Sequence, residues 1–325
     1  MHKLIAIAAG FLATSLASAA AEVYPARPIT VVVPYPAGGP TDTLARILAD
    51  HMKTSLGQSI IIENVTGGGG SIGVGQVARA APDGYTVSIG HWNTHVVHGA
   101  TLNLSFHVLN DFEPVALLAD TPIWLVATKT LPPHDLKELV AWLKQNPGKA
   151  MAGTVGVGGA SDVTGAYFQN VTGTKFQFVP YRGSAPLNQD LIAGHIDLNL
   201  GMAAASYPLV RSGQIKAYAM MAKTRWWAAS DVPTMEEAGV PGLYASFWHG
   251  LWLPKGTPDQ IMAKLNAAAR AALADAGVRQ RFADQGQEIP PPAQQTPQAL
   301  GAYQKAEIEK WWPIIKAAGI KADGS

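Results

Sequence analysis

A short β-branched run followed by a glycine turn and an amphipathic helix recurs along this chain, and this repeat constrains the fold most. Residues 29–33 indicate a strand, "PYPAGGPTDTLAR" leads out of it, and apolar residues then recur at helical spacing over 44–52. A second unit has a strand at 59–63, the turn "NVTGGGGSIG" and a helix at 72–80. Strands that alternate with helices predict a mostly parallel sheet.

The second half of the chain repeats the alternation. A third strand, in "DGYTVSIG", is expected to begin like a hairpin, and an amphipathic helix is expected from Leu136 to Leu143. Further strands are expected at 122–128, 150–155, 175–181, 195–201, 215–222 and within "FWHGLWLPKGTP". Helices predicted at 258–274 and 297–318 are expected to return and pack on the first half.

These patterns predict an α/β protein with two domains. The 325 residues are 48% hydrophobic, which is ample for more than one packed core. We assign residues 22–123 and 250–325 to domain 1 and residues 124–249 to domain 2. Relative motion is expected at the two strands that cross between the domains.

The amino terminus has the pattern of a cleaved secretory signal over residues 1–21. Lys3 precedes an uncharged run from Leu4 to Leu16, which is too short to span a bilayer, and small residues follow at the spacing that a signal peptidase reads. We therefore expect an exported protein without a membrane anchor. The absence of cysteine excludes a lipidated amino terminus, disulfides and thiolate metal sites, and it suits the periplasm.

The charge balance excludes binding driven by bulk electrostatics. The chain has 24 Lys and Arg residues, of which Lys3 lies in the signal, against 23 Asp and Glu residues. Nothing in this balance favours nucleic acid or an anionic membrane surface. Partners must therefore be recognised by local sites, and we expect a monomer.

The glycine turns are candidate anion sites. At Gly38-Gly39-Pro40-Thr41-Asp42, proline presets the first helical φ angle, and the amides from Thr41 onward lack an intrahelical acceptor. Such a helix start has a partial positive charge of about half a unit, so an anion can bind without a cationic side chain. The turn at 67–73 allows a similarly close backbone approach, and Ser71 can cap the helix or donate to a ligand.

Two turns in the second half can hold the other end of a ligand. Thr154, Ser161 and Ser184 would act as neutral donors within the turns at 154–162 and 181–184. Arg182 is the only cation near them in the sequence, and it is equally consistent with a solvated surface charge. In each turn taken singly, Gly, Ser and Asp are also what a simple tight turn with a helix cap requires.

Three other functions fit parts of the sequence. Residues 68–73 match the dinucleotide fingerprint, but Gly90-His91 stand where an acidic residue should hold the ribose. Residues 69–73 match a hydrolase elbow, which would make Ser71 the nucleophile of an exported serine hydrolase, although that serine should directly follow a strand. His91, His95 and His98 would suit a periplasmic metal carrier if they shared a helix face, since the first two are four residues apart.

Aromatic residues adjoin these turns. Trp92 follows the third strand, and Phe247 lies where the chain returns to domain 1. Most of the nine tryptophans are expected to be packing residues. Trp92 or Phe247 could instead line a ligand cleft, and a Trp there would favour an aromatic carboxylate or a longer dicarboxylate over a compact tricarboxylate.

Taken in order, the motifs resemble the Bug (TctC-type) extracytoplasmic solute receptors of tripartite tricarboxylate transporters. The resemblance runs from about Tyr24 to Lys321 and rests on "RPITVVVPYPAGGPTDTLAR", "IIIENVTGGGGSIG", "VARAAPDGYTVSIG", "VPYRGSAPLNQDLIAGHIDL", "DVPTMEEAGVPG" and "FWHGLWLPKGTP". The second-domain loop "GTVGVGGASD" and the third loop "HWNTH" depart from the usual family pattern. These loops differ among such receptors and determine the ligand.

The resemblance implies a periplasmic binding protein of the type II-like, Venus-flytrap form, with two hinge strands and no enzymatic activity or cofactor. It also implies a small carboxylate ligand (a di- or tricarboxylate, an amino acid or an aromatic carboxylate) that is delivered to an inner-membrane transporter. In the family, one ligand carboxylate is held by backbone amides and waters of the first two loops, here 37–42 and 67–72, and Asp42 is expected to brace its loop. The candidate ligand-binding residues are Tyr35, Ala37, Gly38, Gly39, Thr41, Asp42, Gly68, Gly69, Gly70, Ser71, Trp92, Asn93, Thr154, Gly158, Ser161, Arg182, Gly183 and Ser184.

Overall fold

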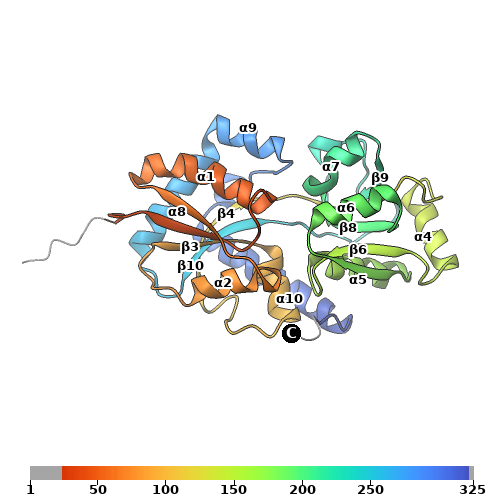
Figure 1. Ribbon diagram of the computed structural model, residues 1–325, viewed down its shortest axis with the longest axis horizontal. Helices are drawn as coiled ribbons and strands as arrows, with labels where there is room; N and C mark the ends of the chain where they lie inside the picture. Colours follow the sequence, from red (N-terminus) through yellow and green to blue (C-terminus); the bar gives the residue numbers. More distant parts are fainter. Residues whose placement is uncertain (1–23, 322–325) are drawn as a thin grey trace, which may run out of the picture.

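The computed structural model describes residues 24–321, which form two lobes side by side (Figure 1). The predicted signal segment, residues 1–21, lies outside the described residues. Over the described range, no helix combines the length and the apolar character that a membrane span requires.

The first lobe is built on a five-stranded sheet in the order β2-β1-β3-β10-β4. Its strands are β1 (Ile29–Val33), β2 (Ile60–Asn64), β3 (Thr86–His91), β4 (Phe112–Ala119) and β10 (His249–Pro254). β1 pairs parallel with β2 and β3, whereas β10 lies antiparallel between β3 and β4. The mostly parallel sheet is confirmed, and its one reversed strand is the strand that returns from the second lobe. The hairpin-like start predicted for the third strand is wrong, because β3 pairs directly with β1 and β10.

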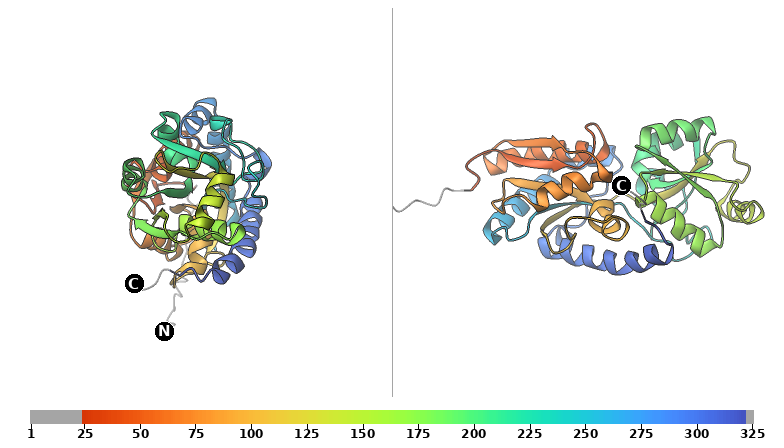
Figure 2. Two further views of the ribbon diagram at one scale, coloured as in Figure 1. Left: turned by 90° about the vertical axis from the view of Figure 1, so that its right-hand side faces the viewer. Right: turned by 60° about the horizontal axis from the view of Figure 1, so that its bottom comes forward.

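Helices cover both faces of this sheet. They are α1 (Pro40–Leu56), α2 (Ser71–Ala78), α3 (His98–Thr101), α8 (Asp259–Ala274), α9 (Ala276–Asp284) and α10 (Pro297–Ala317), with the short 3₁₀ turns η1 (Gly68–Gly70) and η4 (Pro292–Gln294) and the π-helical turn η2 (Asn93–Val97). α1, α8 and α9 contact one another, whereas α10 lies along β4 and η2. Figure 2 shows α10 as the long blue helix that runs beneath the first lobe towards the second. The predicted return of the C-terminal helices to the first half is confirmed.

The second lobe repeats the plan with the sheet order β7-β6-β8-β5-β9. Its strands are β5 (Ile123–Thr128), β6 (Met151–Val155), β7 (Gln177–Tyr181), β8 (Leu198–Met202) and β9 (Ile215–Met220). Its helices are α4 (Leu136–Gln145), α5 (Ala160–Thr172), α6 (Ser184–Ala193), α7 (Ala203–Arg211) and the short η3 (Trp227–Ala229). β6 pairs parallel with β7 and β8, and β5 is the reversed strand.

Two extended segments carry the chain between the lobes. The segment between β4 and β5 pairs with the segment before β10, where Phe247 N–H donates to the Thr121 carbonyl (2.8 Å) and Thr121 N–H returns the bond (3.2 Å). α10 adds a further connection. Its Trp311 ring packs edge-on against Tyr167 of α5 at 5.3 Å, and Lys310 Nζ donates to the Tyr244 carbonyl at 2.6 Å. The lobes are therefore joined by two strands and by one helix that touches both.

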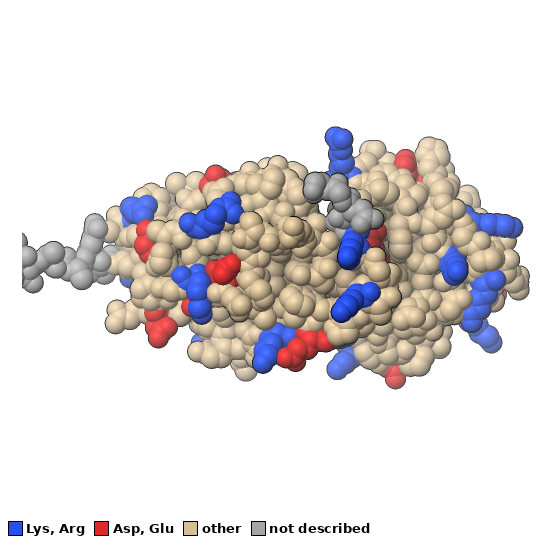
Figure 3. All heavy atoms as spheres, turned by 90° about the horizontal axis from the view of Figure 1, so that it is seen from below, with Lys and Arg blue, Asp and Glu red and all other residues tan. Residues whose placement is uncertain are grey.

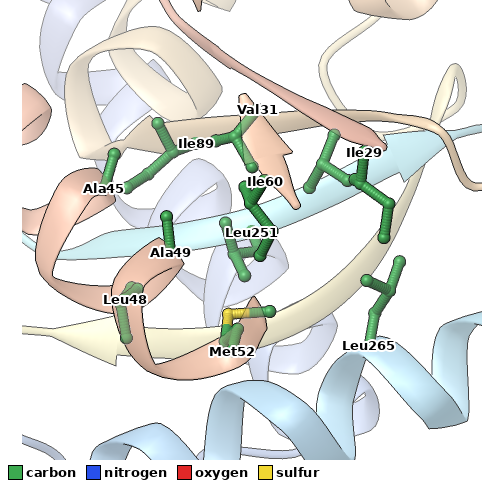
Figure 4. A pocket seen from close by; sticks show the side chains of 11 residues that line it. Ile29, Val31, Ala45, Leu48, Ala49, Met52, Ile60, Ile89, Leu251 and Leu265 are labelled. Atoms are coloured by element: carbon green, nitrogen blue, oxygen red, sulfur yellow. The ribbon is translucent and has the colours of Figure 1, made fainter. Parts of the chain in front are cut away.

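The layer between the first sheet and α1 and α8 is largely apolar. Its buried side chains include Ile29, Leu48, Met52 and Leu265, which point toward a void of about 20 Å³ (Figure 4). The void lacks polar partners for a water molecule. It is therefore part of the core and separate from the loop ends described below.

Truncating this layer should destabilise the first lobe. Leu265→Ala removes a side chain that is 2% exposed and enlarges the void, so the free energy of unfolding should fall by about 2–5 kcal/mol in urea titrations. Ile61→Ala is the control, because Ile61 in β2 is 51% exposed and its loss should change stability by less than about 0.5 kcal/mol. Equal effects of the two changes would contradict this description of the core.

Candidate functional site

A buried carboxylate holds the turn after β1. Asp42, in the first turn of α1, is 2% exposed. One of its oxygens accepts from the N–H of Gly38 (2.8 Å) and from Arg46 Nε (2.9 Å). The other accepts from the side-chain amide of Asn64 at the end of β2 (2.9 Å) and from Arg46 Nη2 (3.0 Å). Asp42 therefore braces the turn and links it to β2, and both of its oxygens are occupied, so we remove its carboxylate from the candidate ligand contacts.

The electrostatics of Asp42 follow from this arrangement. Burial alone would raise the pKa of Asp42, but the hydrogen bonds from Arg46, Gly38 and Asn64 outweigh it and hold the pKa below its ordinary value. Asp42 is thus ionised at neutral pH and compensated by Arg46. The pair leaves little net charge beside the turn.

The first turn leaves several backbone donors unused. Gly39 N–H is bonded within the turn at 3.4 Å, but among residues 24–321 no acceptor pairs with the N–H groups of Ala37, Thr41 or Asp42. Pro40 occupies the first helical position, where a missing N–H costs nothing. The start of α1 therefore presents free amides and the positive end of the helix dipole.

The Thr41 hydroxyl is turned into the protein. Thr41 is 5% exposed, and its Oγ1 lies 3.1 Å from Nε2 of His249 in β10. Only its backbone amide remains as a candidate contact in this structure.

The turn after β2 has a backbone that only glycine adopts readily. Gly67, Gly68, Gly69 and Gly70 all have positive φ angles, of 120°, 55°, 63° and 103°. Gly70 N–H is bonded to the Gly67 carbonyl at 2.9 Å, whereas the N–H groups of Gly67, Gly68 and Gly69 have no acceptor in the described part of the chain. Tyr35 joins this turn to the first one by donating its hydroxyl to the Gly69 carbonyl at 2.9 Å.

The position of Ser71 disfavours a hydrolase elbow. Ser71 begins α2, and the glycine turn separates it from β2, which ends at Asn64. The histidine beside this turn is His98, whose Nε2 lies 3.0 Å from Asn93 Nδ2. Ser71 therefore lacks the strand-end setting that the motif requires.

The third loop is helical and faces inward. After β3, the turn η2 closes with His98 N–H bonded to the Asn93 carbonyl, which is the i to i−5 bond of a π-helix. Trp92 is fully buried and packs edge-on against Trp311 at 5.0 Å. Asn93 is 8% exposed and directs its amide to His98 and to the Tyr35 hydroxyl. The expectation that Trp92 lines a cleft is contradicted, and Asn93 supports the first two turns from beneath.

Four histidines form a neutral layer behind these turns. His91, His95, His98 and His249 are each at most 3% exposed. Burial lowers the pKa of His95 to about 3, of His98 to about 4 and of His249 to about 3. The pKa of His91 falls well below its usual range because of burial and of the other three rings.

The rings do not converge on a metal. His91 stacks on Tyr35 (4.7 Å between centroids), whereas His95 stacks on Trp252 (3.7 Å). Over residues 24–321, no group of three His, Asp or Glu side chains is placed to bind a metal ion. This geometry disfavours the carrier reading of His91 and His95.

In the second lobe, the turn after β6 uses most of its own donors. The Thr154 hydroxyl donates to the Gly156 carbonyl (3.4 Å), and Ser161 Oγ accepts from the Val155 N–H (2.9 Å). Thr154 and Ser161 are both buried, as is Gly158. The Ser161 hydroxyl keeps its own proton to donate, whereas Thr154 serves mainly to shape the turn.

The turn after β7 is more open. Arg182 is exposed, and no acidic group of residues 24–321 forms an ion pair with it. Gly183 caps the start of α6, and Ser184 is its first residue. This turn thus combines a free guanidinium with a helix start.

The turns occupy facing ends of the two lobes. β1 and β2 end on the side of the first lobe that faces the second, and β6 and β7 end on the opposing side (Figure 1). On the face shown in Figure 3, acidic and basic side chains are scattered without a large patch of one sign. In the first two turns of the first lobe the unpaired donors are backbone amides, because the neighbouring cation, Arg46, is paired with Asp42.

Three residues of this network were absent from the candidate ligand-binding residues, although His98 was a candidate metal ligand. Arg46 could have been found, because it lies four residues after Asp42 on a predicted helix. Asn64 and His98 reach the turns only through the packing of β2 and η2, so the sequence carries no spacing signal for them.

Known proteins share the sequence and the fold of this chain. The sequence profile described as "Tripartite tricarboxylate transporter family receptor" (TctC) matches residues 44–320. MatC of Rhodopseudomonas palustris, solved with bound malate, is 38% identical, with a TM-score of 0.83 over 90% of this chain and 100% of its own. A second R. palustris protein, solved with adipate, is 34% identical, with a TM-score of 0.84 over 92% and 99%. The periplasmic binding protein BugD is 36% identical, with a TM-score of 0.82 over 92% and 99%.

Removing the Asp42 brace should loosen the first turn. Asp42→Ala removes the charged acceptor of the Gly38 N–H, the Asn64 side-chain amide and the Arg46 guanidinium, so the free energy of unfolding should fall by about 1–3 kcal/mol in urea titrations. The exposed pair Asp50 and Lys53 provides the control, and Asp50→Ala should have almost no effect. A loss for Asp42→Ala no greater than that for Asp50→Ala would refute the brace.

The buried histidines should make stability depend on pH. Unfolded imidazoles have pKa values near 6.5, whereas these folded ones lie at about 3 to 4, so between those limits the unfolded state binds more protons and stability falls as the pH is lowered. His249→Gln should reduce this slope, by at most about 1.4 kcal/mol per pH unit, in urea titrations between pH 7 and pH 4.5. His134→Gln, which changes an exposed ring, should leave the slope unchanged. An unaltered slope in His249→Gln would show that this ring is not neutral in the folded state.

Proposed function

The chain belongs to the TctC family of tripartite tricarboxylate transporter receptors, and we propose that it captures a small dicarboxylate in the periplasm and delivers it to an inner-membrane transporter of that class. The family is one of solute-binding receptors, and the fold is that of a two-domain periplasmic binding protein. Export by cleavage of the segment at residues 1–21 is part of this proposal, as is a monomeric receptor.

The observation that carries the proposal is that two sets of backbone N–H groups at one end of the first lobe have no hydrogen-bond acceptor among residues 24–321. Thr41 and Asp42 offer N–H groups at the start of α1, and Gly68 and Gly69 offer theirs beside the start of α2. Tyr35 holds the two turns together through Gly69. Such an arrangement favours an anion, because both helix starts have positive partial charge, Arg46 compensates the Asp42 carboxylate, and no carboxylate of the described residues bonds these four N–H groups.

In the proposed complex, the first lobe binds one carboxylate and the second lobe binds the remainder of the ligand. The first-lobe donors are the N–H groups of Ala37, Thr41, Asp42, Gly68 and Gly69 and the Ser71 hydroxyl. Gly38, Gly39 and Gly70, whose N–H groups are bonded within the protein, line the site beside Tyr35. The second-lobe contacts are Gly158, Ser161, Arg182, Gly183 and Ser184, with Arg182 as the counter-charge for a second carboxylate. Closure would turn domain 2 (124–249) against domain 1 (22–123 and 250–325) about the paired crossing segments.

Dicarboxylates are the first ligands to test. The two R. palustris relatives were solved with malate and with adipate, which differ in length but both carry two carboxylates. The argument for an aromatic ligand rested on Trp92, and the burial of that ring removes it. A neutral histidine layer also leaves the first-lobe site without a formal cation, which suits one carboxylate better than three.

Calorimetry on the exported form of the chain tests the proposal. Malate, adipate, citrate and terephthalate should be titrated separately, and either malate or adipate should bind more tightly than citrate. Arg182→Ala should weaken that binding about tenfold or more, because a charge-assisted hydrogen bond contributes roughly 1.5–3 kcal/mol.

The control is Arg279→Ala, which removes another exposed arginine from the outer side of the first lobe. It should leave the affinity unchanged. Failure of every organic acid to bind, or equal losses in the two arginine variants, would contradict the proposal.

A further inference from the structure

The π-helical turn η2 depends on a helix that lies some two hundred residues away in the sequence. Widening a helix to the i to i−5 pattern breaks the regular bonding of nearby carbonyls, which then need other partners. Here the partners come from α10: Gln304 Nε2 donates to the His95 carbonyl (2.9 Å), and Trp312 Nε1 donates to the Val96 carbonyl (2.9 Å). α10 therefore stabilises this unusual turn by direct capping.

Gln304 uses both of its amide donors and its acceptor oxygen. It is 2% exposed, and its Nε2 also donates to the Val108 carbonyl at 2.9 Å. Its Oε1 accepts from Trp252 Nε1 at 3.1 Å. Because the His95 ring stacks on Trp252 with an interplanar angle of 11°, Gln304 fixes both the backbone and the ring of His95.

A continuous set of contacts leads from η2 to the glycine turn. Asn93, the first residue of η2, donates its amide to the Tyr35 hydroxyl at 3.5 Å and lies 3.0 Å from His98 Nε2. Tyr35 in turn donates to the Gly69 carbonyl at 2.9 Å. The His98 ring lies so close to Gly69 that a Cβ there would be 3.0 Å from it. The position of η2 thus sets the surface on which the turn at 67–70 rests.

We propose that Gln304 is a positioning residue for the ligand site, because it holds η2 where Asn93 and His98 support the glycine turn that presents its amides to the carboxylate. The inference rests on the proposed function for its effect on affinity. It assigns to a buried residue of α10 a role in binding without any contact with the ligand.

The test compares Gln304→Glu with a matched change at Asn266. Asn266 of α8 is also buried, and its amide also donates to two carbonyls, those of Val115 and Gln295, at 2.7 Å each. In Gln304→Glu and in Asn266→Asp, an oxygen replaces the donating nitrogen and faces two carbonyl oxygens. Both variants should lose thermal stability to a similar degree.

Only the change at Gln304 should alter the ligand site. We expect the affinity for the best dicarboxylate, measured well below the melting temperature, to fall at least tenfold in Gln304→Glu and less than twofold in Asn266→Asp. The backbone amide NMR signals of residues 67–70 in the ligand-free protein should move in Gln304→Glu and stay in place in Asn266→Asp. Gln304→Met, which removes the donors without adding charge, is the replacement if Gln304→Glu does not fold, with the same expectations.

Unchanged glycine signals together with an affinity equal to that of Asn266→Asp would overturn the inference. If the wild-type protein bound no carboxylate, the proposed function would fail, but the glycine signals would still decide whether Gln304 positions the turn. The two failures are therefore distinguishable.

Discussion

The hydrogen bond from the Tyr35 hydroxyl to the Gly69 carbonyl is the interaction on which the candidate site depends. It joins two turns that belong to different strand-turn-helix units and reaches the glycines of the second turn directly. Other bonds between these units come from Asn64 at the end of β2, which donates to Asp42 and to the Tyr35 carbonyl. Tyr35 itself is held by stacking on His91 and by the side-chain amide of Asn93. The bond to Gly69 therefore depends on the conformation of the third loop.

The site achieves positive potential without formal charge. Arg46 is neutralised by Asp42, and burial keeps the four histidines unprotonated. What remains near the first two turns is the partial charge of unpaired peptide N–H groups, which is fixed in direction and carries no counter-ion. A layer of buried, neutral imidazoles packs behind them and adds no formal charge.

Sequence patterns predicted the parts of the structure that are set locally. The strand at 29–33, the helix that starts at Pro40 and the four-glycine turn follow from β-branched content, proline position and glycine conformations, and the structure shows all three. β4 escaped notice because Glu113 and Pro114 interrupt its apolar run. The antiparallel direction of β10 could not be predicted, because it follows from the return of the chain from the second lobe and not from the residues of the strand.

The side-chain roles were harder to predict, because they depend on distant partners. A tryptophan at a strand end can face a ligand or the core, and Trp92 faces the core because Trp311 of α10 lies against it. Thr154 and Ser161 are ordinary donors by type, yet the tight turn after β6 engages both. "HWNTH" suggested a loop. It forms a π-helical turn because Gln304 and Trp312 of α10 donate hydrogen bonds to carbonyls of the turn.

α10 also restricts how the lobes can turn relative to each other. Its Trp311 ring packs against Tyr167, and its Lys310 ammonium donates to the Tyr244 carbonyl. Tyr167 and Tyr244 lie outside the first-lobe sheet against which α10 packs. When the second lobe rotates, Tyr167 must slide along the Trp311 ring, or the hydrogen bond of the Lys310 ammonium to the Tyr244 carbonyl must break. The C-terminal part of α10 therefore limits the directions in which the two lobes can rotate relative to each other. The same helix carries Gln304, which supports the third loop.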